Sequence, residues 1–383
     1  MSTPTSPGPL LTVDLEAVAA NVSLFAQRVA GRLMAVVKAD GFGHDAVAVA
    51  RTALANGASS LGVTSWEEAR SLRDEGIAAP VLSWLNPVDA DFASAIRRRV
   101  DLAVPGVGHL QAVAAAAVLA GRHADVHLHA DVGMARDGAD PACWDELCRQ
   151  ARLLEQRGLV RVIGVMGHLG SADSPGDPDN RTGLRRFETA VAQARRHGLR
   201  PRLRHLAATS ATLSAPATHF DLCRVGAGLF GIDASRTTQL HPAMTLTAPV
   251  VSVRDVPPGT SVGYGHTHVT ARHTRLALLP LGYADGVPRA ASGRAWIQVG
   301  GRRHRMVGLV SMDQLVVDVG TSGVEPGDVA TVFGSGDHGE PTVQEWARWA
   351  GTIEHDIVTG IGRRVSRALT SDHRLRTPVG VGR

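Results

Sequence analysis

Short apolar runs alternate with amphipathic stretches over the first 240 or so residues of the chain. Near-continuous apolar runs are typical of parallel strands whose two faces are both buried, and the stretches between them have helical periodicity. Eight such runs occur, at residues 33–39, 60–65, 80–85, 101–106, 125–132, 162–169, 202–209 and 222–230. Eight parallel strands separated by helices, within roughly 200 to 250 residues, predict an α/β fold of the (β/α)8 barrel type.

The pattern of apolar and polar residues changes after about residue 243. Short β-rich segments with Gly and Pro turns follow, interrupted by one clear helical stretch at residues 342–351. This pattern predicts a second, mostly β domain. We therefore expect a disordered Pro-, Ser- and Thr-rich tail at residues 1–9, the barrel domain at 10–242, and the C-terminal β domain at 243–383. Packing of the first strand, residues 10–15, against the β domain is left open.

Composition narrows the class of protein. The chain has 383 residues, 44% of them hydrophobic, and a formal charge of +4 with a pI near 9.5. Its arginines are scattered rather than clustered, so we expect no nucleic-acid partner. No apolar run approaches the roughly 18 residues of a membrane span, and the first ten residues lack the features of a signal peptide. Three cysteines without a CxxC pair suit a reducing compartment, and we expect a cytoplasmic protein.

Lys38 is the only lysine of the chain, because the other 39 of the 40 cationic residues are arginine. Lysine can lose its proton when desolvated and can condense with a carbonyl group, whereas arginine stays protonated. Lys38 ends the first barrel strand and precedes a turn with Gly41 and Gly43. The carboxyl ends of barrel strands carry the active site, so Lys38 is predicted to be a Schiff-base lysine.

Other strand ends of the predicted barrel place polar residues at the same mouth. Asp131 and Arg136 follow the fifth strand, His168 the sixth and Thr209 the seventh, and a glycine cluster from Arg224 to Gly228 lies on the eighth. Small residues and a hydroxyl on the last two strands match the phosphate site common in this fold. A lysine amine and a phosphate cradle in one mouth predict pyridoxal 5'-phosphate (PLP) as cofactor.

Tyrosine and histidine residues provide two further candidates for functional sites. The only tyrosines, Tyr264 and Tyr283, both lie beside glycines in the β domain, and one could supply a phenol as an acid or base. His127 and His129 alternate on one strand, but no third ligand stands out, so no metal site is predicted.

Nine motifs, in order, resemble the alanine racemase family of fold-type III PLP enzymes over about residues 10 to 370. They are AVVKADGFGHD, DVGMARDG, GVMGHLGSAD, RHLAATSATL, CRVGAGLFG, SVGYGHTH, LPLGYADGVPR, VGLVSMDQ and GTIEHDI. The resemblance implies a PLP-dependent isomerase that interconverts L- and D-alanine for D-alanine biosynthesis. It also implies a homodimer with active sites at the interface, a small amino-acid substrate, and no membrane partner.

The resemblance assigns roles residue by residue. Lys38 and Tyr264 would be the two catalytic bases on opposite faces of the substrate, with Tyr264 contributed by the partner subunit. Arg136 and Met312 would contact the substrate, with Asp313 and Tyr283 in supporting places. The implied cofactor-binding residues are Lys38, Phe42, Trp84, Arg136, His168, Thr209, Arg224, Gly226, Ala227 and His355. An arginine on the pyridine nitrogen, Arg224, keeps its proton and suits a racemase rather than an aminotransferase.

Several positions depart from the family pattern. Phe42 and His355 replace tyrosines whose hydroxyls usually reach the cofactor phosphate, which predicts weaker PLP retention unless a protonated His355 compensates. Ala208-Thr209 replaces an Asn-Ser pair, His129 a lysine that is often carbamylated, and Ser311 a cysteine. The alternatives are a racemase for another small amino acid, a racemase-derived PLP protein with changed or lost activity, a fold-type III decarboxylase, and a PLP carrier protein. The last two are disfavoured by the tyrosine motifs and by the β domain.

Overall fold

The computed structural model describes residues 8–370, and within them it forms two compact units. One unit is Val18–Leu240, and the other combines the described residues before it with those from His241 onward. Residues 1–7 of the predicted tail, and residues 371–383, lie outside the described part. Within it, no helix has both the length and the apolar character needed to span a membrane.

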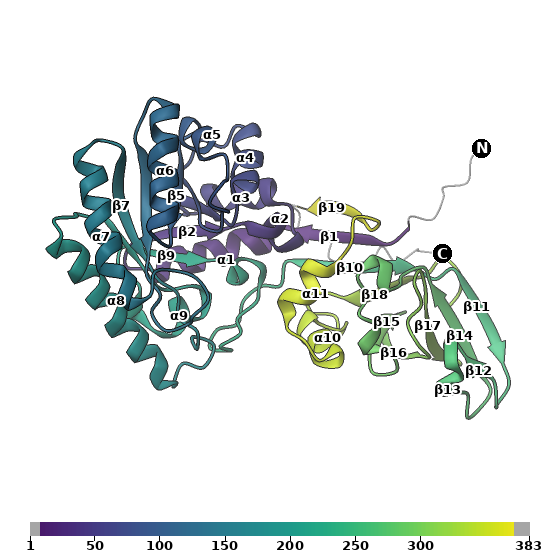
Figure 1. Cartoon of the computed structure of the whole chain (residues 1–383). Coiled ribbons are helices and arrows are strands. Elements are labelled where there is room, and N and C mark those ends of the chain that lie inside the picture. Colours follow the sequence, from purple (N-terminus) through teal and green to yellow (C-terminus); the bar gives the residue numbers. More distant parts are fainter. Residues whose placement is uncertain (1–7, 371–383) are drawn as a thin grey trace. The chain divides into compact units, whose positions relative to one another are not determined.

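The first unit is an eight-stranded parallel barrel (Figure 1). Its strands are paired in the order β8-β7-β6-β5-β4-β3-β2-β9. They are β2 (Arg32–Val36), β3 (Ser60–Val63), β4 (Val81–Ser83), β5 (Val100–Val104), β6 (Ala124–His129), β7 (Val160–Met166), β8 (Leu203–His205) and β9 (Leu222–Val225). Between β8 and β9, Asp221 N–H donates to Arg204 O at 3.1 Å and Arg224 N–H to Ala207 O at 3.0 Å, which nearly closes the barrel. The predicted barrel, with a strand in each of the eight apolar runs, is confirmed.

Helices alternate with these strands and surround them (Figure 1). They are α1 (Leu15–Arg28), α2 (Lys38–Gly43), α3 (Ala46–Ala55), α4 (Trp66–Asp74), α5 (Phe92–Arg97), α6 (Val107–Ala120), α7 (Pro141–Gln156), α8 (Pro178–Arg196) and α9 (Thr209–Ser214). Both α7 and α8 begin with an Asp-Pro pair. Asp140 and Asp177 accept hydrogen bonds from the first backbone N–H groups, and the proline at the first helical position has no N–H to satisfy.

An apolar layer crosses the interior of the barrel. Its buried members come from five strands, and Trp84, directly after β4, packs against them. They are Met34, Leu82, Ala103, Met166 and Leu222. Because a barrel interior is filled by such side chains, it is a packed core rather than a pore, and its two ends are separate surfaces.

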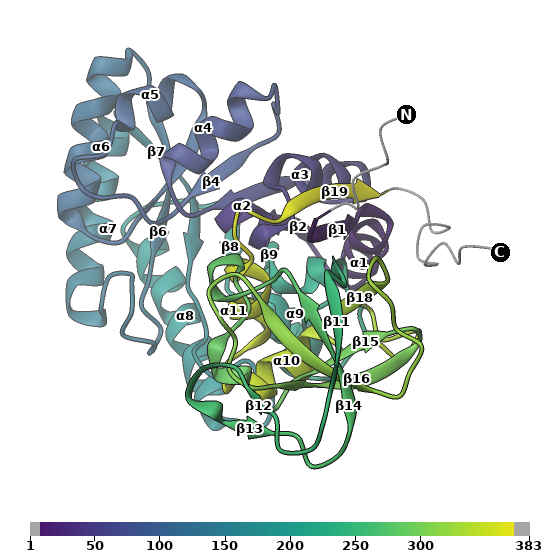
Figure 2. The same cartoon turned by 90° about the vertical axis from the view of Figure 1, so that its right-hand side faces the viewer.

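The second unit contains a nine-stranded sheet (Figure 2). Its strands are paired in the order β11-β14-β17-β16-β15-β18-β10-β1-β19. The strands are β1 (Leu10–Asp14), β10 (Met244–Pro249), β11 (Ser252–Val256), β14 (Thr274–Leu279), β15 (Trp296–Val299), β16 (Arg302–Val307), β17 (Leu315–Gly320), β18 (Val329–Phe333) and β19 (Ser366–Thr370). The predicted mostly β domain is confirmed. β1 pairs with β10 and β19, so the first strand of the chain lies in this sheet.

Two short strands and one short helix of this unit were not predicted individually. β12 (Ser261–Val262) and β13 (His268–Val269) form a two-stranded ribbon. The predicted helix at residues 342–351 is α10 (Val343–Ala350), with Thr342 and Glu345 forming a capping box. A second helix, α11 (Glu354–Gly360), follows it. Its first residues include His355.

Candidate active site

Lys38 begins a left-handed turn at the carboxyl end of β2. Ala39, Asp40, Gly41 and Phe42 have φ between 52° and 61° and ψ between 37° and 50°. Left-handed backbone costs about 1–2 kcal/mol for each residue other than glycine, so this turn is strained at three positions. Such strain persists only where the surroundings hold it in place, and it gathers at functional sites.

Hydrogen bonds hold the turn from both sides. Glu68 Oε1 accepts from Ala39 N–H at 2.7 Å, and Asp40 Oδ1 accepts from Ala46 N–H at 3.1 Å. The His44 ring contacts the turn through Nδ1, which lies 2.9 Å from Phe42 O. The same ring stacks on the Phe230 ring, with 4.3 Å between the two centroids. These contacts fix the direction in which the strand delivers Lys38.

The Lys38 amine lies in an environment that favours its neutral form. Burial lowers the pKa of Lys38, the Arg136 guanidinium lowers it further, and the Glu68 carboxylate partly opposes both. A neutral amine is the nucleophilic form of lysine. The shift is in the direction expected for a lysine that reacts through its neutral amine.

The end of β9 is a close-packed glycine segment. A Cβ on Gly226 would lie 2.9 Å from Phe42 Cζ, and one on Gly228 would lie 2.4 Å from Phe25 Cζ. Thr209 Oγ1 accepts from Gly228 N–H at 3.2 Å. Gly226 and Ala227 open the short 3₁₀ helix η2 (Ala227–Phe230), so backbone donors at this point can approach an anion closely.

Arg224 is the most densely bonded cation of the barrel. It is buried, its NH1 donates to His205 O at 2.7 Å and to His205 Nδ1 at 3.0 Å, and its NH2 donates to Gly167 O at 2.7 Å and faces His168 Nδ1 at 3.3 Å. Within residues 8–370 no acceptor is recorded for its Nε–H. Burial lowers the pKa of Arg224 to about 10, so the guanidinium remains charged near neutral pH.

Burial, and to a smaller extent this cation, favour the neutral form of the neighbouring histidines. Burial first, and then Arg224 and Arg136, lower the pKa of His168 to about 3. Burial, His127 and Arg224 hold the pKa of His205 well below its usual value. Because Arg224 donates to Nδ1 of His205, the His205 proton is on Nε2 and donates to His127 Nδ1 at 2.8 Å.

The remaining predicted barrel residues lie on neighbouring strand ends. Asp131 accepts from the N–H groups of Gly133, Met134 and Ala135 and so shapes the loop that carries the exposed Arg136. Trp84 lies over Gly62, where a Cβ would be 2.7 Å from its ring. His129 Nδ1 is 3.3 Å from Asp137 Oδ2. Among the residues that the structure describes, no group of three His, Cys, Asp or Glu side chains could hold a metal ion.

The other predicted residues belong to the second unit. The loops of Tyr283 and Met312 are joined by hydrogen bonds from Tyr283 N–H to Ser311 O and from Ala284 N–H to Met312 O, both at 3.0 Å. Arg364 bridges Asp313 at 2.7 Å and Asp285 at 3.1 Å. Tyr264, in η3 (Tyr264–His266), is 71% exposed, and His355 is half-buried on α11.

The structure thus groups the predicted residues in two sets. In the barrel mouth, Arg136 lowers the pKa of both Lys38 and His168, and Arg224 also lowers that of His168. Tyr283, Met312 and Asp313 instead share one surface of the β unit. Sequence reasoning missed Glu68, which no motif marks. It also missed His205, although this residue lies inside the RHLAATSATL motif.

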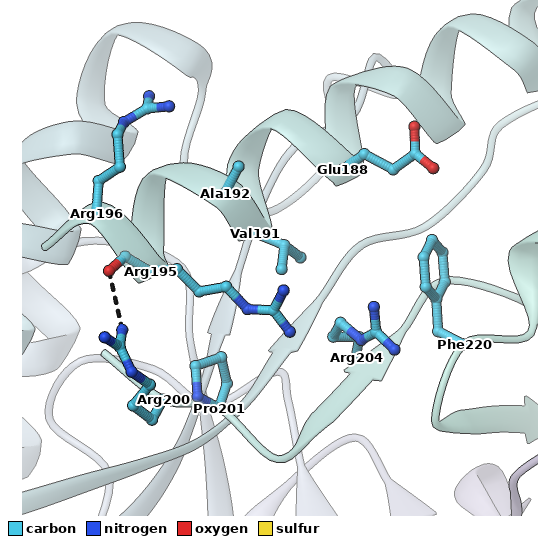
Figure 3. Close-up of a pocket in the computed structure, with 9 residues that line it drawn as sticks. All are labelled: Glu188, Val191, Ala192, Arg195, Arg196, Arg200, Pro201, Arg204 and Phe220. Carbon is cyan, nitrogen blue, oxygen red and sulfur yellow. Dashed lines mark hydrogen bonds between the residues drawn. The ribbon is translucent and has the colours of Figure 1, made fainter. Parts of the chain in front are cut away.

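A separate groove lies outside the barrel, between α8 and β8 (Figure 3). Its volume is about 780 Å³. Arg204 lies over the Phe220 ring at 5.2 Å, and Arg200 donates to Arg195 O at 3.0 Å. None of the predicted site residues lines this groove.

Comparisons with known proteins agree on one family. The profile of the alanine racemase N-terminal domain matches residues 13–234, and that of the alanine racemase C-terminal domain matches residues 243–369. The alanine racemase of Thermobifida fusca is 46% identical over 94% of this chain and 97% of its own length.

Solved structures give the same result. The alanine racemase from D-cycloserine-producing Streptomyces lavendulae superimposes with a TM-score of 0.94 and 42% identity, covering 98% of this chain and 99% of that one. The alanine racemase of Bacillus anthracis, determined with bound L-Ala-P, has a TM-score of 0.86 and 30% identity, with 96% of each chain covered. On these matches, which span both units, the chain belongs to the alanine racemase family.

Proposed function

We propose that this protein is a PLP-dependent alanine racemase. Support comes from the family membership of both units together with the lowered pKa of the Lys38 amine at the carboxyl end of β2. When bound, PLP supplies an electron-withdrawing ring that makes the Cα proton of an amino acid removable. The residues of the chain must then hold the cofactor, orient the substrate and move that proton.

The barrel mouth fits this cofactor at three points. The Lys38 amine suits an aldehyde, and the Gly226–Ala227 backbone with the Thr209 hydroxyl suits a phosphate. Arg224 Nε–H, which has no acceptor recorded within residues 8–370, suits a ring nitrogen. His168 and His205 fix the guanidinium, and their neutral rings leave its positive charge in place.

Racemisation requires a proton to leave Cα on one face and return on the other, so two groups on opposite faces are needed. We assign these roles to the Lys38 amine and the Tyr264 phenol. Arg136 would hold the substrate carboxylate, together with the backbone at Met312. Phe42, Trp84 and His355 would bound the cofactor, and Asp313 and Tyr283 would support the Met312 loop.

Tyr264 is 71% exposed on the β unit. This exposure supports a homodimer in which each Tyr264 completes the site of the partner subunit. The three cysteines are all free thiols, which fits the reducing environment of the cytoplasm.

Incubation of the purified protein with L-alanine in D2O tests the proposal. We expect loss of optical rotation together with deuterium at Cα in both enantiomers, because each proton returned comes from exchangeable groups. L-Serine and bulkier amino acids, assayed in parallel, identify the preferred substrate. Deuterium uptake without D-alanine, or no exchange at all, would rule out alanine racemisation.

A further inference from the structure

A second cavity lies at the amino-terminal end of the barrel, opposite the strand ends that carry Lys38. Its volume is about 570 Å³, within the range of small-molecule sites. All eight strands contribute lining residues from their first positions or directly before them, for example Arg32 on β2, Asp125 on β6 and Leu222 on β9. The apolar layer of the barrel, with Met34 and Leu82, forms part of its floor. The cavity is therefore not part of the candidate active site.

The charge of this cavity is strongly positive. Seven arginines line it against three carboxylates. Two arginines are neutralised locally, because Arg161 makes a bidentate pair with Asp125 at 2.6 and 2.7 Å and Arg152 pairs with Glu155 at 2.9 Å. The third carboxylate, Asp101, has no arginine within ion-pair distance among the described residues.

The other five arginines make no ion pair with a carboxylate within residues 8–370, although the Asp101 carboxylate acts on Arg73 from a greater distance. Arg73 and Arg200 donate to backbone carbonyl groups. For Arg32, Arg99 and Arg202 the described structure records no side-chain hydrogen bond or ion pair at all. The guanidinium groups of Arg32, Arg99 and Arg202 therefore have N–H donors that an anion in the cavity could use.

A buried donor of the lining lacks a partner as well. His127 is 1% exposed, and its Nδ1 accepts from His205. Its proton is therefore on Nε2, which has no hydrogen-bond partner within the described residues and lies 3.8 Å from Asp101 Oδ2. A buried N–H without a partner is costly, and a ligand acceptor would satisfy it.

We propose that this cavity binds a small phosphate monoester with an apolar substituent. A phosphate monoester carries about −1.5 to −2 charges and three terminal oxygens, which suits several unpaired guanidinium groups better than a carboxylate does. The apolar floor at Met34, Leu82 and Leu222 accommodates the substituent. Because Arg224 and His205 join His127 to the active site, the occupied cavity also contacts the network that fixes Arg224.

Calorimetric titration of the PLP-loaded protein with phenyl phosphate tests the proposal. We expect saturable binding, one molecule per chain, with a Kd of about 1 mM or tighter. Inorganic phosphate and benzoate should each bind more weakly, since the first lacks the apolar group and the second has less charge. Phenol should not bind. Saturable binding that is no weaker for benzoate would overturn the choice of phosphate, and absence of saturable binding would overturn the site.

Two double variants test whether phenyl phosphate binds in this cavity. Arg99→Gln combined with Arg202→Gln removes two exposed guanidinium groups of the cavity and should weaken phenyl phosphate about tenfold or more. Arg195→Gln combined with Arg196→Gln removes the same charge from the outer groove of Figure 3. This groove shares Arg200 with the cavity but neither substituted residue, so the pair serves as the matched control. The control should bind as the unmodified protein does. Equal weakening in both pairs would show non-specific charge attraction and reject the cavity.

Discussion

At the scale of single residues, the chain controls protonation at the barrel mouth by burial and by fixed arginines. Burial and Arg136 lower the pKa of Lys38, so the fraction of neutral amine at a given pH depends on both. The side chain assigned to the substrate therefore also prepares the amine for the cofactor.

Arg136→Gln should shift the pH dependence of cofactor capture. Only the neutral amine reacts, so the rate at which cofactor-free protein captures pyridoxal rises with pH through the pKa of Lys38. Removal of the Arg136 charge raises this pKa, and the profile should move to higher pH. Stopped-flow absorbance measures the shift, with Arg149→Gln on the outer face of α7 as a control. A profile that stays in place would show that Arg136 does not act on Lys38.

Phe42→Tyr should strengthen cofactor retention. Phe42 Cζ, the atom that would carry a hydroxyl, lies against Gly226 in the segment assigned to the phosphate. A hydrogen bond to a charged group contributes about 1.5 to 3 kcal/mol, which corresponds to a Kd about tenfold or more tighter. Equilibrium dialysis of PLP measures the change. Phe42→Leu, which adds no hydroxyl, is the control, and a Kd unchanged in Phe42→Tyr would contradict the assignment.

The buried His205 and the half-buried His168 should make the fold sensitive to acid. The pKa of His168 is about 3 in the folded chain, and that of His205 is also well below the value of 6.5 that applies when unfolded. The unfolded chain therefore binds more protons below pH 6.5, and stability falls as pH falls. Each histidine contributes a slope of about 1.4 kcal/mol per pH unit until its folded pKa is reached.

His205→Gln should flatten this dependence by the share of one histidine. Urea unfolding at a series of pH values between 5 and 7 measures the slope. The exposed His273→Gln is the control and should keep the full slope. A slope unchanged in His205→Gln would mean that this ring takes up protons in the folded state.

At the scale of elements, the regular strands could be predicted and the turn after β2 could not. Apolar residues predominate in most of the barrel strands, and this is a local property of the sequence. The left-handed turn instead places Ala39, Asp40 and Phe42 in a conformation that none of them prefers. This turn is held by contacts with His44 and Glu68. Glu68 lies on α4, 29 residues along the chain from Ala39, to which it is hydrogen-bonded.

Gly41→Ala should destabilise this turn more than an ordinary positive-φ position. Gly41 has φ +61°, and an added Cβ would lie 3.2 Å from the Ala46 backbone. Gly121, at the end of α6, has φ +68° with no atom within 4 Å of an added Cβ, so Gly121→Ala reports the backbone cost alone, about 1 kcal/mol. Urea unfolding compares the two variants. Equal losses would show that the contact with Ala46 relaxes freely.

At the scale of the whole molecule, the sequence could predict the two units better than the long-range pairings that build them. The strand at residues 10–14 joins the C-terminal sheet because it finds β10 and β19 as partners, a long-range pairing that local pattern does not encode. The motif that contains Tyr264 could likewise be recognised in the sequence. Whether the Tyr264 phenol acts in its own subunit or in the partner subunit is not encoded in that motif.

Mixing two inactive variants decides where Tyr264 acts. Lys38→Ala and Tyr264→Phe should each form an inactive homodimer, because each lacks one of the two proton-transfer groups. If every site combines Lys38 of one subunit with Tyr264 of the other, a mixed dimer contains one site without either group and one intact site. Random exchange of equal amounts makes half of the dimers mixed, so activity should return to about a quarter of that of the unmodified protein. Differently tagged subunits establish that mixed dimers have formed. Mixed dimers without activity would place Lys38 and Tyr264 in the same subunit, because no arrangement within one chain can then restore a complete pair.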